Sequence, residues 1–211
     1  MIGPTFPTTY SCNTSTSCGC STKSAILTRI IGGEAAGLQT WGWAVLLSIK
    51  DSLCGGSIIA DSWILTAAHC VMGATVSQIT IYAGSNAQRN GSQILSVATI
   101  TIHPHYSPST YVNDIALLYL STPLNITDRS VSTICLPSVN LSTLSASEWP
   151  PPGTRVVAVG WGRLSENGLT ASILQQVTMR TVDHRSLMCS SVINDWSVQF
   201  CAMASYKGIY S

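Results

Sequence analysis

Short apolar runs recur along the chain from residue 30 onward, separated by glycine, asparagine, serine and proline. They include residues 43–49, residues 78–82 and, after a proline-rich stretch, residues 154–159. Many short runs with turn residues between them predict the strands of an antiparallel β sandwich or barrel. Since no helical period extends beyond three turns, the pattern predicts an all-β fold.

The same pattern divides the chain into three parts. Residues 1–29 are rich in serine, threonine and cysteine and lack periodicity, as expected of a pro-segment or linker. Residues 30–137 carry the first set of strand-like runs. Residues 138–211 begin with an irregular connection that ends near Gly153, and further strand-like runs follow. The sequence therefore predicts two lobes behind a linker.

The charge balance excludes some classes of partner. Lysine plus arginine number 10, aspartate plus glutamate number 9, and charged residues make up 9% of the chain. Because so few charges cannot form a phosphate-tracking surface, we expect no nucleic-acid partner. The longest apolar run, residues 41–49, is too short to span a bilayer, and we expect no membrane helix.

Cysteine usage and glycosylation sequons indicate an extracellular protein. The 8 cysteines are an even number, as expected for disulfides formed in an oxidising compartment. Four sequons begin at Asn13, Asn90, Asn125 and Asn140. The first residues, Met1 to Pro4, begin no signal peptide, so we expect the N-terminus to be incomplete or wrongly assigned.

Four motifs, in a fixed order, carry the chemistry. They are Arg29-Ile30-Ile31-Gly32-Gly33, then Cys54-Gly55-Gly56-Ser57 with Leu65-Thr66-Ala67-Ala68-His69-Cys70, then Asn113-Asp114-Ile115-Ala116, and last Gly160-Trp161-Gly162. Their order and spacing resemble the trypsin/chymotrypsin family of serine proteases, from residue 29 to residue 211. The resemblance implies two antiparallel β-barrels, the first in residues 30–137 and the second within residues 138–211. It also implies a secreted serine endopeptidase that needs no cofactor and no metal.

In this resemblance His69 and Asp114 are two members of a Ser-His-Asp triad. A serine hydroxyl is a weak nucleophile, so His69 would accept its proton and later protonate the leaving amine. Asp114 would hold the imidazole in the correct tautomer and stabilise the imidazolium. The substrate would be a protein or peptide, and an activating trypsin-like protease would cut the zymogen between Arg29 and Ile30.

The third member of the triad is missing from this sequence. No Gly-Asp-Ser-Gly-Gly run occurs in it, and the resemblance places the nucleophile and the oxyanion donors beyond Ser211. We therefore expect an incomplete second barrel and an inactive chain. The alternative is a non-catalytic homologue that binds a partner or regulates a cascade. Tyr210 and Ser211 would lie in the specificity pocket, where uncharged Tyr210 argues against a preference for Arg or Lys.

Other candidate residues receive structural interpretations. Ser57 has glycine neighbours but falls in a strand and lacks the Gly-x-Ser-x-Gly elbow of a nucleophile. His103 and His105 flank a proline without a credible third ligand, so we expect no metal site there. His184 is expected to be an ordinary surface histidine.

The resemblance also implies a disulfide pattern. It implies a Cys54–Cys70 bridge beneath the histidine and a Cys189–Cys201 bridge in the second lobe. It further tethers the pro-segment to Cys135, through Cys12, Cys18 or Cys20. We favour Cys20 for the tether, which leaves Cys12 for Cys18, and the other pairings stay open.

Overall fold

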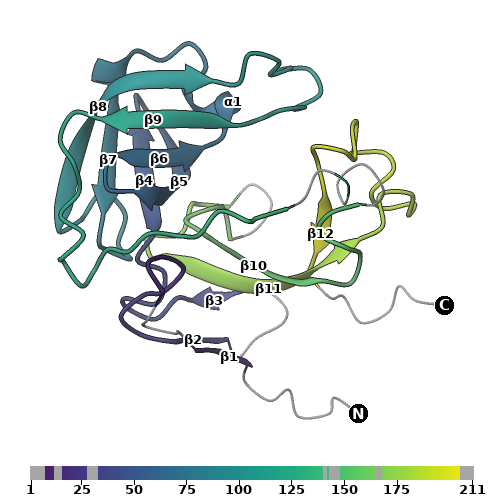
Figure 1. The fold of residues 1–211 in the computed structure, drawn as a ribbon, viewed down its shortest axis with the longest axis horizontal. Coiled ribbons are helices and arrows are strands. Elements are labelled where there is room, and N and C mark those ends of the chain that lie inside the picture. Colours follow the sequence, from purple (N-terminus) through teal and green to yellow (C-terminus); the bar gives the residue numbers. More distant parts are fainter. Residues whose placement is uncertain are drawn as a thin grey trace.

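β-Strands dominate the structure, a computed structural model that describes residues 8–11, 16–27, 33–139, 142, 148–164 and 168–204 (Figure 1). The strands are β1 (Thr8–Tyr10), β2 (Ala25–Leu27), β3 (Glu34–Ala35), β4 (Ala44–Ile49), β5 (Ser52–Ala60), β6 (Trp63–Thr66), β7 (Ile79–Ala83), β8 (Gln93–Ile102), β9 (Ala116–Leu120), β10 (Arg155–Gly160), β11 (Gln175–Val182) and β12 (Cys201–Met203). The helices with described bounds are α1 (Ala68–Val71) and the 3-10 helix η1 (Val76–Gln78). Among the described residues, every helix falls short of the length and apolar character that crossing a bilayer demands. The all-β prediction is confirmed.

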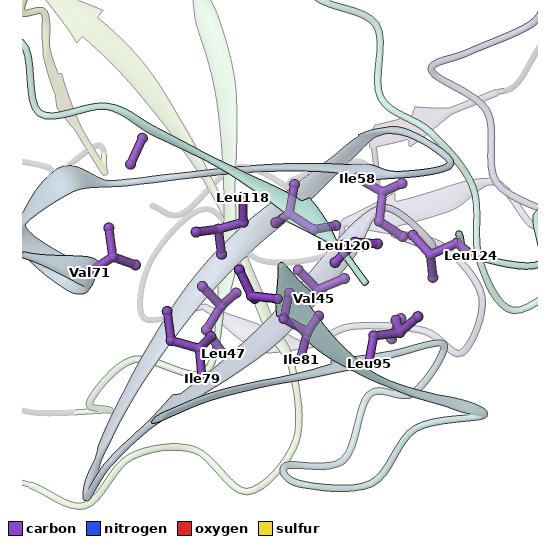
Figure 2. Packing of buried hydrophobic residues seen from close by; sticks show 14 of the residues in the cluster. Val45, Leu47, Ile58, Val71, Ile79, Ile81, Leu95, Leu118, Leu120 and Leu124 are labelled. Carbon is purple, nitrogen blue, oxygen red and sulfur yellow. The ribbon is translucent and has the colours of Figure 1, made fainter. Parts of the chain in front are cut away.

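The first lobe is a closed barrel, with its strands hydrogen-bonded in the order β4-β5-β6-β9-β8-β7. Strand β4 pairs with both β5 and β7, and these two pairings close the ring. The interior is filled by aliphatic side chains (Figure 2): Val45, Leu47, Ile58, Ile79, Ile81, Leu95, Leu118 and Leu120. Burial of each such side chain stabilises the fold by about 1.5–3 kcal/mol. The barrel is therefore a rigid support for residues on its rim.

Strand β4 is buried on both faces and joins the two lobes. Val45 and Leu47 belong to the barrel core, whereas Leu46 packs against Trp161 and Leu174 of the second lobe. Because both faces are covered, residues 43–47 are continuously apolar rather than alternating, and Ser48 is the one polar residue before Ile49.

The second lobe is a four-stranded sheet that does not close into a barrel among the described residues. Strand β10 pairs antiparallel with β11, from Arg155 opposite Arg180 to Gly160 opposite Gln175. Strand β12 pairs with the far part of β11, and β3 pairs with its beginning. Strand β3 lies in the segment assigned to the first barrel, yet it extends the sheet of the second lobe.

A short hairpin occurs in the segment expected to lack regular structure. Strands β1 and β2 pair antiparallel, and Ala25 and Leu27 are each only 3% exposed. Gln176 of β11 donates its side-chain amide to the Ile26 carbonyl oxygen at 2.9 Å. Strands of three residues are too short to show a periodicity, so packing against the second lobe is what orders them.

The disulfides confirm two expected pairs and correct a third. Two bridges form as expected, namely Cys54–Cys70 and Cys189–Cys201. The tether joins Cys18 to Cys135, so the expected use of Cys20 for the tether and the expected Cys12–Cys18 pair are both wrong. Gly19 has φ of 77° and donates its N–H to the Thr133 carbonyl oxygen at 2.8 Å, which turns Cys18 toward Cys135. Cys20 is also disulfide-bonded.

Candidate active site

The barrel topology brings His69 and Asp114 to the same rim. Strand β6 pairs antiparallel with β9, with Thr66 opposite Ala116. His69 lies in α1 just after β6, and Asp114 lies just before β9. Because the end of one antiparallel strand adjoins the start of its neighbour, two side chains 45 residues apart in sequence meet here.

Asp114 accepts two hydrogen bonds from His69. Its Oδ2 lies 2.6 Å from Nδ1 of the ring, and its Oδ1 accepts the backbone N–H of His69 at 2.8 Å. The imidazole is 50% exposed and the carboxylate 19% exposed. A carboxylate only accepts hydrogen bonds, so Nδ1 donates and Nε2 keeps its lone pair. This arrangement leaves Nε2 able to accept a proton.

A disulfide fixes the helix that carries His69. The Cys54–Cys70 bridge ties α1 to β5, and Cys70 Sγ lies 3.5 Å from His69 Nε2. Cys54, His69 and Cys70 form a cluster of residue types that bind metals. Because the two sulfurs are bonded to each other, they offer no thiolate, and the cluster is not suited to a metal.

Two tyrosines stand beside the pair. The Tyr111 ring meets His69 edge-on, with ring centroids 5.9 Å apart and an interplanar angle of 82°. Tyr111 and Asn113 have φ of 53° and 57°, left-handed conformations that cost a non-glycine residue about 1–3 kcal/mol. Partial burial and then the charge of Asp114 raise the pKa of Tyr106 above its usual value, so its phenol is neutral at neutral pH.

The second lobe contacts this rim through Gln199. Its Nε2 donates to the carbonyl oxygens of Thr110 at 3.1 Å and Tyr111 at 3.2 Å. Its Oε1 accepts the backbone N–H groups of Asn194 and Asp195, both at 2.9 Å. Asn194 Nδ2 adds a bond to the Thr110 carbonyl oxygen at 3.1 Å. We call these contacts the Gln199 clasp, and they hold the strained backbone around Tyr111.

A cleft of about 770 Å³ lies between the lobes beside Asp114. Its walls come from both lobes and include Leu65, Thr66, Ala67, Asn113, Asp114, Ile115, Val159, Gly160, Trp161 and Val198. Peptides and small ligands bind in clefts of this size, which are mostly apolar with a few polar groups.

The remaining candidates fall into three groups. Ser57 lies within β5, where it lines the cleft but is not on a sharp turn. The rings of His103 and His105 are 5.8 Å apart, and within the described part of the chain no third ligand joins them. Asn90 and Asn125 are exposed, as a glycosylation acceptor must be.

The prediction for His184 is wrong, because this histidine is not an ordinary surface residue. Its side chain is 26% exposed, and Nδ1 lies 3.1 Å from Oε2 of Glu148, whose side chain is 7% exposed. Glu148 and His184 are 36 residues apart and share no motif, so nothing in the sequence pointed to their contact.

Several predicted positions lie outside the described residues: Cys12, Asn13, Arg29, Ile30, Asn140, Tyr210 and Ser211.

A closed antiparallel barrel, a second β-sheet and a His–Asp pair at the cleft between them define a protein of the serine-protease class. More specifically, the chain belongs to the trypsin family, whose model matches residues 30–210. The resemblance drawn from the motifs is confirmed.

Two curated relatives illustrate the family membership. Serine proteinase stubble of Drosophila melanogaster is 36% identical over 179 residues, which cover 79% of this chain and 22% of that protein. Serine protease 56 of Homo sapiens is 37% identical over 152 residues, which cover 70% of this chain and 24% of that protein. The chain thus spans less than a quarter of the length of either relative.

A solved structure shares the fold. The crystal structure of the scabies mite inactivated protease paralogue S-D1 superposes with a TM-score of 0.72 and is 28% identical. The match covers 83% of this chain and 75% of that one.

Proposed function

We propose that this chain carries the general-base half of the catalytic machinery of a secreted serine endopeptidase. The observation that supports the proposal is the double hydrogen bond from Asp114 to the ring and the backbone of His69. Such a carboxylate fixes both the orientation and the tautomer of the imidazole. Family membership supports peptide-bond hydrolysis as the reaction.

In the proposed reaction His69 Nε2 takes the proton of a serine hydroxyl as that oxygen attacks the scissile carbonyl. The same nitrogen then returns the proton to the leaving amine, while Asp114 stabilises the imidazolium. No Gly-Asp-Ser-Gly-Gly run occurs in the 211 residues. We therefore propose that hydrolysis needs a serine and oxyanion donors that these residues do not supply.

The disulfides support an extracellular zymogen. Cys18 and Cys135 are bonded, so a cut by a trypsin-like activator between Arg29 and Ile30 would leave the N-terminal piece attached. Because Tyr210 matches the pocket position and carries no charge, we propose a preference for small or apolar residues over Arg and Lys. A substrate-library profile dominated by Arg or Lys would contradict this assignment of Tyr210.

A non-catalytic homologue is the second candidate. The observation that favours it is the likeness to a protein described as an inactivated protease paralogue. The intact His69–Asp114 geometry favours the peptidase, because a protein without catalysis has no need to keep this pair.

The test compares two polypeptides. The transcript is read past codon 211, and any in-frame extension is expressed beside the 211-residue chain, with fluorogenic peptides as substrates. We expect an extension that carries the serine motif to hydrolyse them and the 211-residue chain to remain at background. In the active form, Asp114→Asn should lower kcat by about 10⁴-fold, because the amide favours the wrong imidazole tautomer.

The controls separate catalysis from folding. His69→Ala should abolish hydrolysis, and His105→Ala, at an exposed histidine, should leave it unchanged. Turnover by the 211-residue chain that His69→Ala removes would overturn the need for an added serine. A stop codon with no hydrolysis would support the non-catalytic homologue instead.

A further inference from the structure

A second cluster of ionisable side chains lies in the other lobe. Strands β10 and β11 are antiparallel, so the chain that approaches β10 and the chain that leaves β11 share one edge of the sheet. Glu148 comes from the approaching segment, and Asp183 and His184 directly follow β11. These three residues do not line the cleft beside Asp114. The cluster is therefore separate from the candidate active site.

One carboxylate oxygen of Glu148 lacks a hydrogen-bond partner among the described residues. Its side chain is 7% exposed, and only Oε2 is bonded, to His184 Nδ1 at 3.1 Å and to the His184 backbone N–H at 3.4 Å. Oε1 is buried and has no hydrogen-bond partner among the described residues. An unpartnered carboxylate oxygen in the protein interior is costly. The carboxylates of Glu148 and Asp183 outnumber the single guanidinium of Arg185, so the cluster with a neutral imidazole has one net negative charge.

We propose that Glu148, Asp183 and His184 form a binding site for a divalent transition-metal ion of the zinc type. Each residue offers one ligand atom, and these atoms all lie within 4.8 Å of one another. His184 Nδ1 is 3.9 Å from Asp183 Oδ1. An ion between them would replace the hydrogen bond from His184 to Glu148 and bring a positive charge to the buried carboxylate.

The donor set selects the kind of ion. One imidazole nitrogen and two carboxylates suit zinc, which takes three protein ligands and leaves its fourth position to water. Calcium takes six to eight oxygen ligands, a set that these residues do not offer. Among divalent ions with imidazole ligands, copper and zinc bind more tightly than manganese or iron.

Neighbouring side chains hold the ligands in place. Arg185 donates to both carboxylate oxygens of Asp183, from Nε to Oδ1 at 2.9 Å and from a terminal nitrogen to Oδ2 at 2.6 Å. The Trp196 ring stacks on His184, with centroids 5.3 Å apart and planes 15° apart. Contacts of this kind orient metal ligands and tune their affinity. The ion would fix the start of the loop that carries the Gln199 clasp.

The test measures zinc binding to the 211-residue chain by competition with a chromophoric chelator at neutral pH. We expect one zinc ion per chain and a Kd at least tenfold higher in Glu148→Gln and in His184→Asn. Asn can still donate a hydrogen bond to Glu148, so His184→Asn keeps the local pairing and serves if Glu148→Gln fails to fold. His103→Asn is the matched control and should bind zinc like the wild type.

A second measurement needs no variant. X-ray absorption at the zinc edge of the wild-type complex should show one imidazole, oxygen ligands and no sulfur. No zinc binding would overturn the proposal. Two imidazoles in the spectrum, or binding lost only in His103→Asn, would overturn it in favour of the His103–His105 pair.

Discussion

Two adjacent glycines in β5 offer a sharp test of the barrel core. A Cβ at Gly56 would lie 2.8 Å from Ile64 Cγ2, 2.9 Å from Leu47 Cδ1 and 3.1 Å from Val45 Cγ2. These neighbours are fully buried, and the β-branched Ile64 and Val45 have little rotamer freedom with which to move away. A Cβ at Gly55 would meet nothing within 4 Å, and neither glycine has a positive φ.

We expect Gly56→Ala to overpack the barrel and lower the free energy of unfolding by about 1–3 kcal/mol. Gly55→Ala adds the same methyl one residue away and should change the stability by less than about 0.5 kcal/mol. For a chain of this size each kcal/mol corresponds to about 2–4 °C in Tm. Urea titrations of the disulfide-intact chain can be followed by tryptophan fluorescence. Their denaturation midpoints compare the stability of the two variants in the same way. If Gly56→Ala is as stable as Gly55→Ala, the assignment of Gly56 to the barrel interior is wrong.

Three further predictions concern the pro-segment tether, the Asp128 carboxylate and the open sheet of the second lobe. Limited trypsin digestion should leave the N-terminal piece attached on a non-reducing gel, and Cys18→Ser should release it whereas Cys20→Ser should not; the reverse would contradict the Cys18–Cys135 tether. Hydrogen bonds from the side chains of Ser130 and then Ser92 lower the pKa of Asp128 from 3.8 to about 2, so the stability that they provide is complete above about pH 4 and is lost as the pH falls toward 2. Asp128→Asn should flatten the pH dependence of the unfolding midpoint in that window, and an unchanged slope would count against this role. The sheet of the second lobe is open among the described residues, and large apolar side chains are exposed between residues 187 and 200, so the purified chain should bind a hydrophobic dye; little dye binding would refute this.

The sequence predicted the strands of the barrel from local pattern and the meeting of His69 with Asp114 from the family motifs that carry them. Aliphatic runs with turn residues between them carry the strand signal. The His69 and Asp114 motifs flank two strands that pair with each other, so recognition of the family was enough to bring them together. Their double hydrogen bond is a consequence of that pairing.

The sequence did not predict contacts that depend on the path of a loop. Cys18 and Cys20 are equivalent by spacing, and the turn at Gly19, whose φ is 77°, decides between them. Glu148 and His184 come from two irregular segments, where polar residues follow no period and burial cannot be inferred. The same holds for Gln199, whose four side-chain hydrogen bonds are all tertiary or within its own loop.

The Gln199 clasp makes the backbone beside His69 depend on both lobes. The carbonyl groups of Thr110 and Tyr111, next to His69, are held by a side chain 89 and 88 residues further along the chain. That side chain belongs to the loop closed by Cys189 and Cys201. A change of length or sequence in this loop would therefore reshape the surroundings of His69 without altering any residue that touches Asp114.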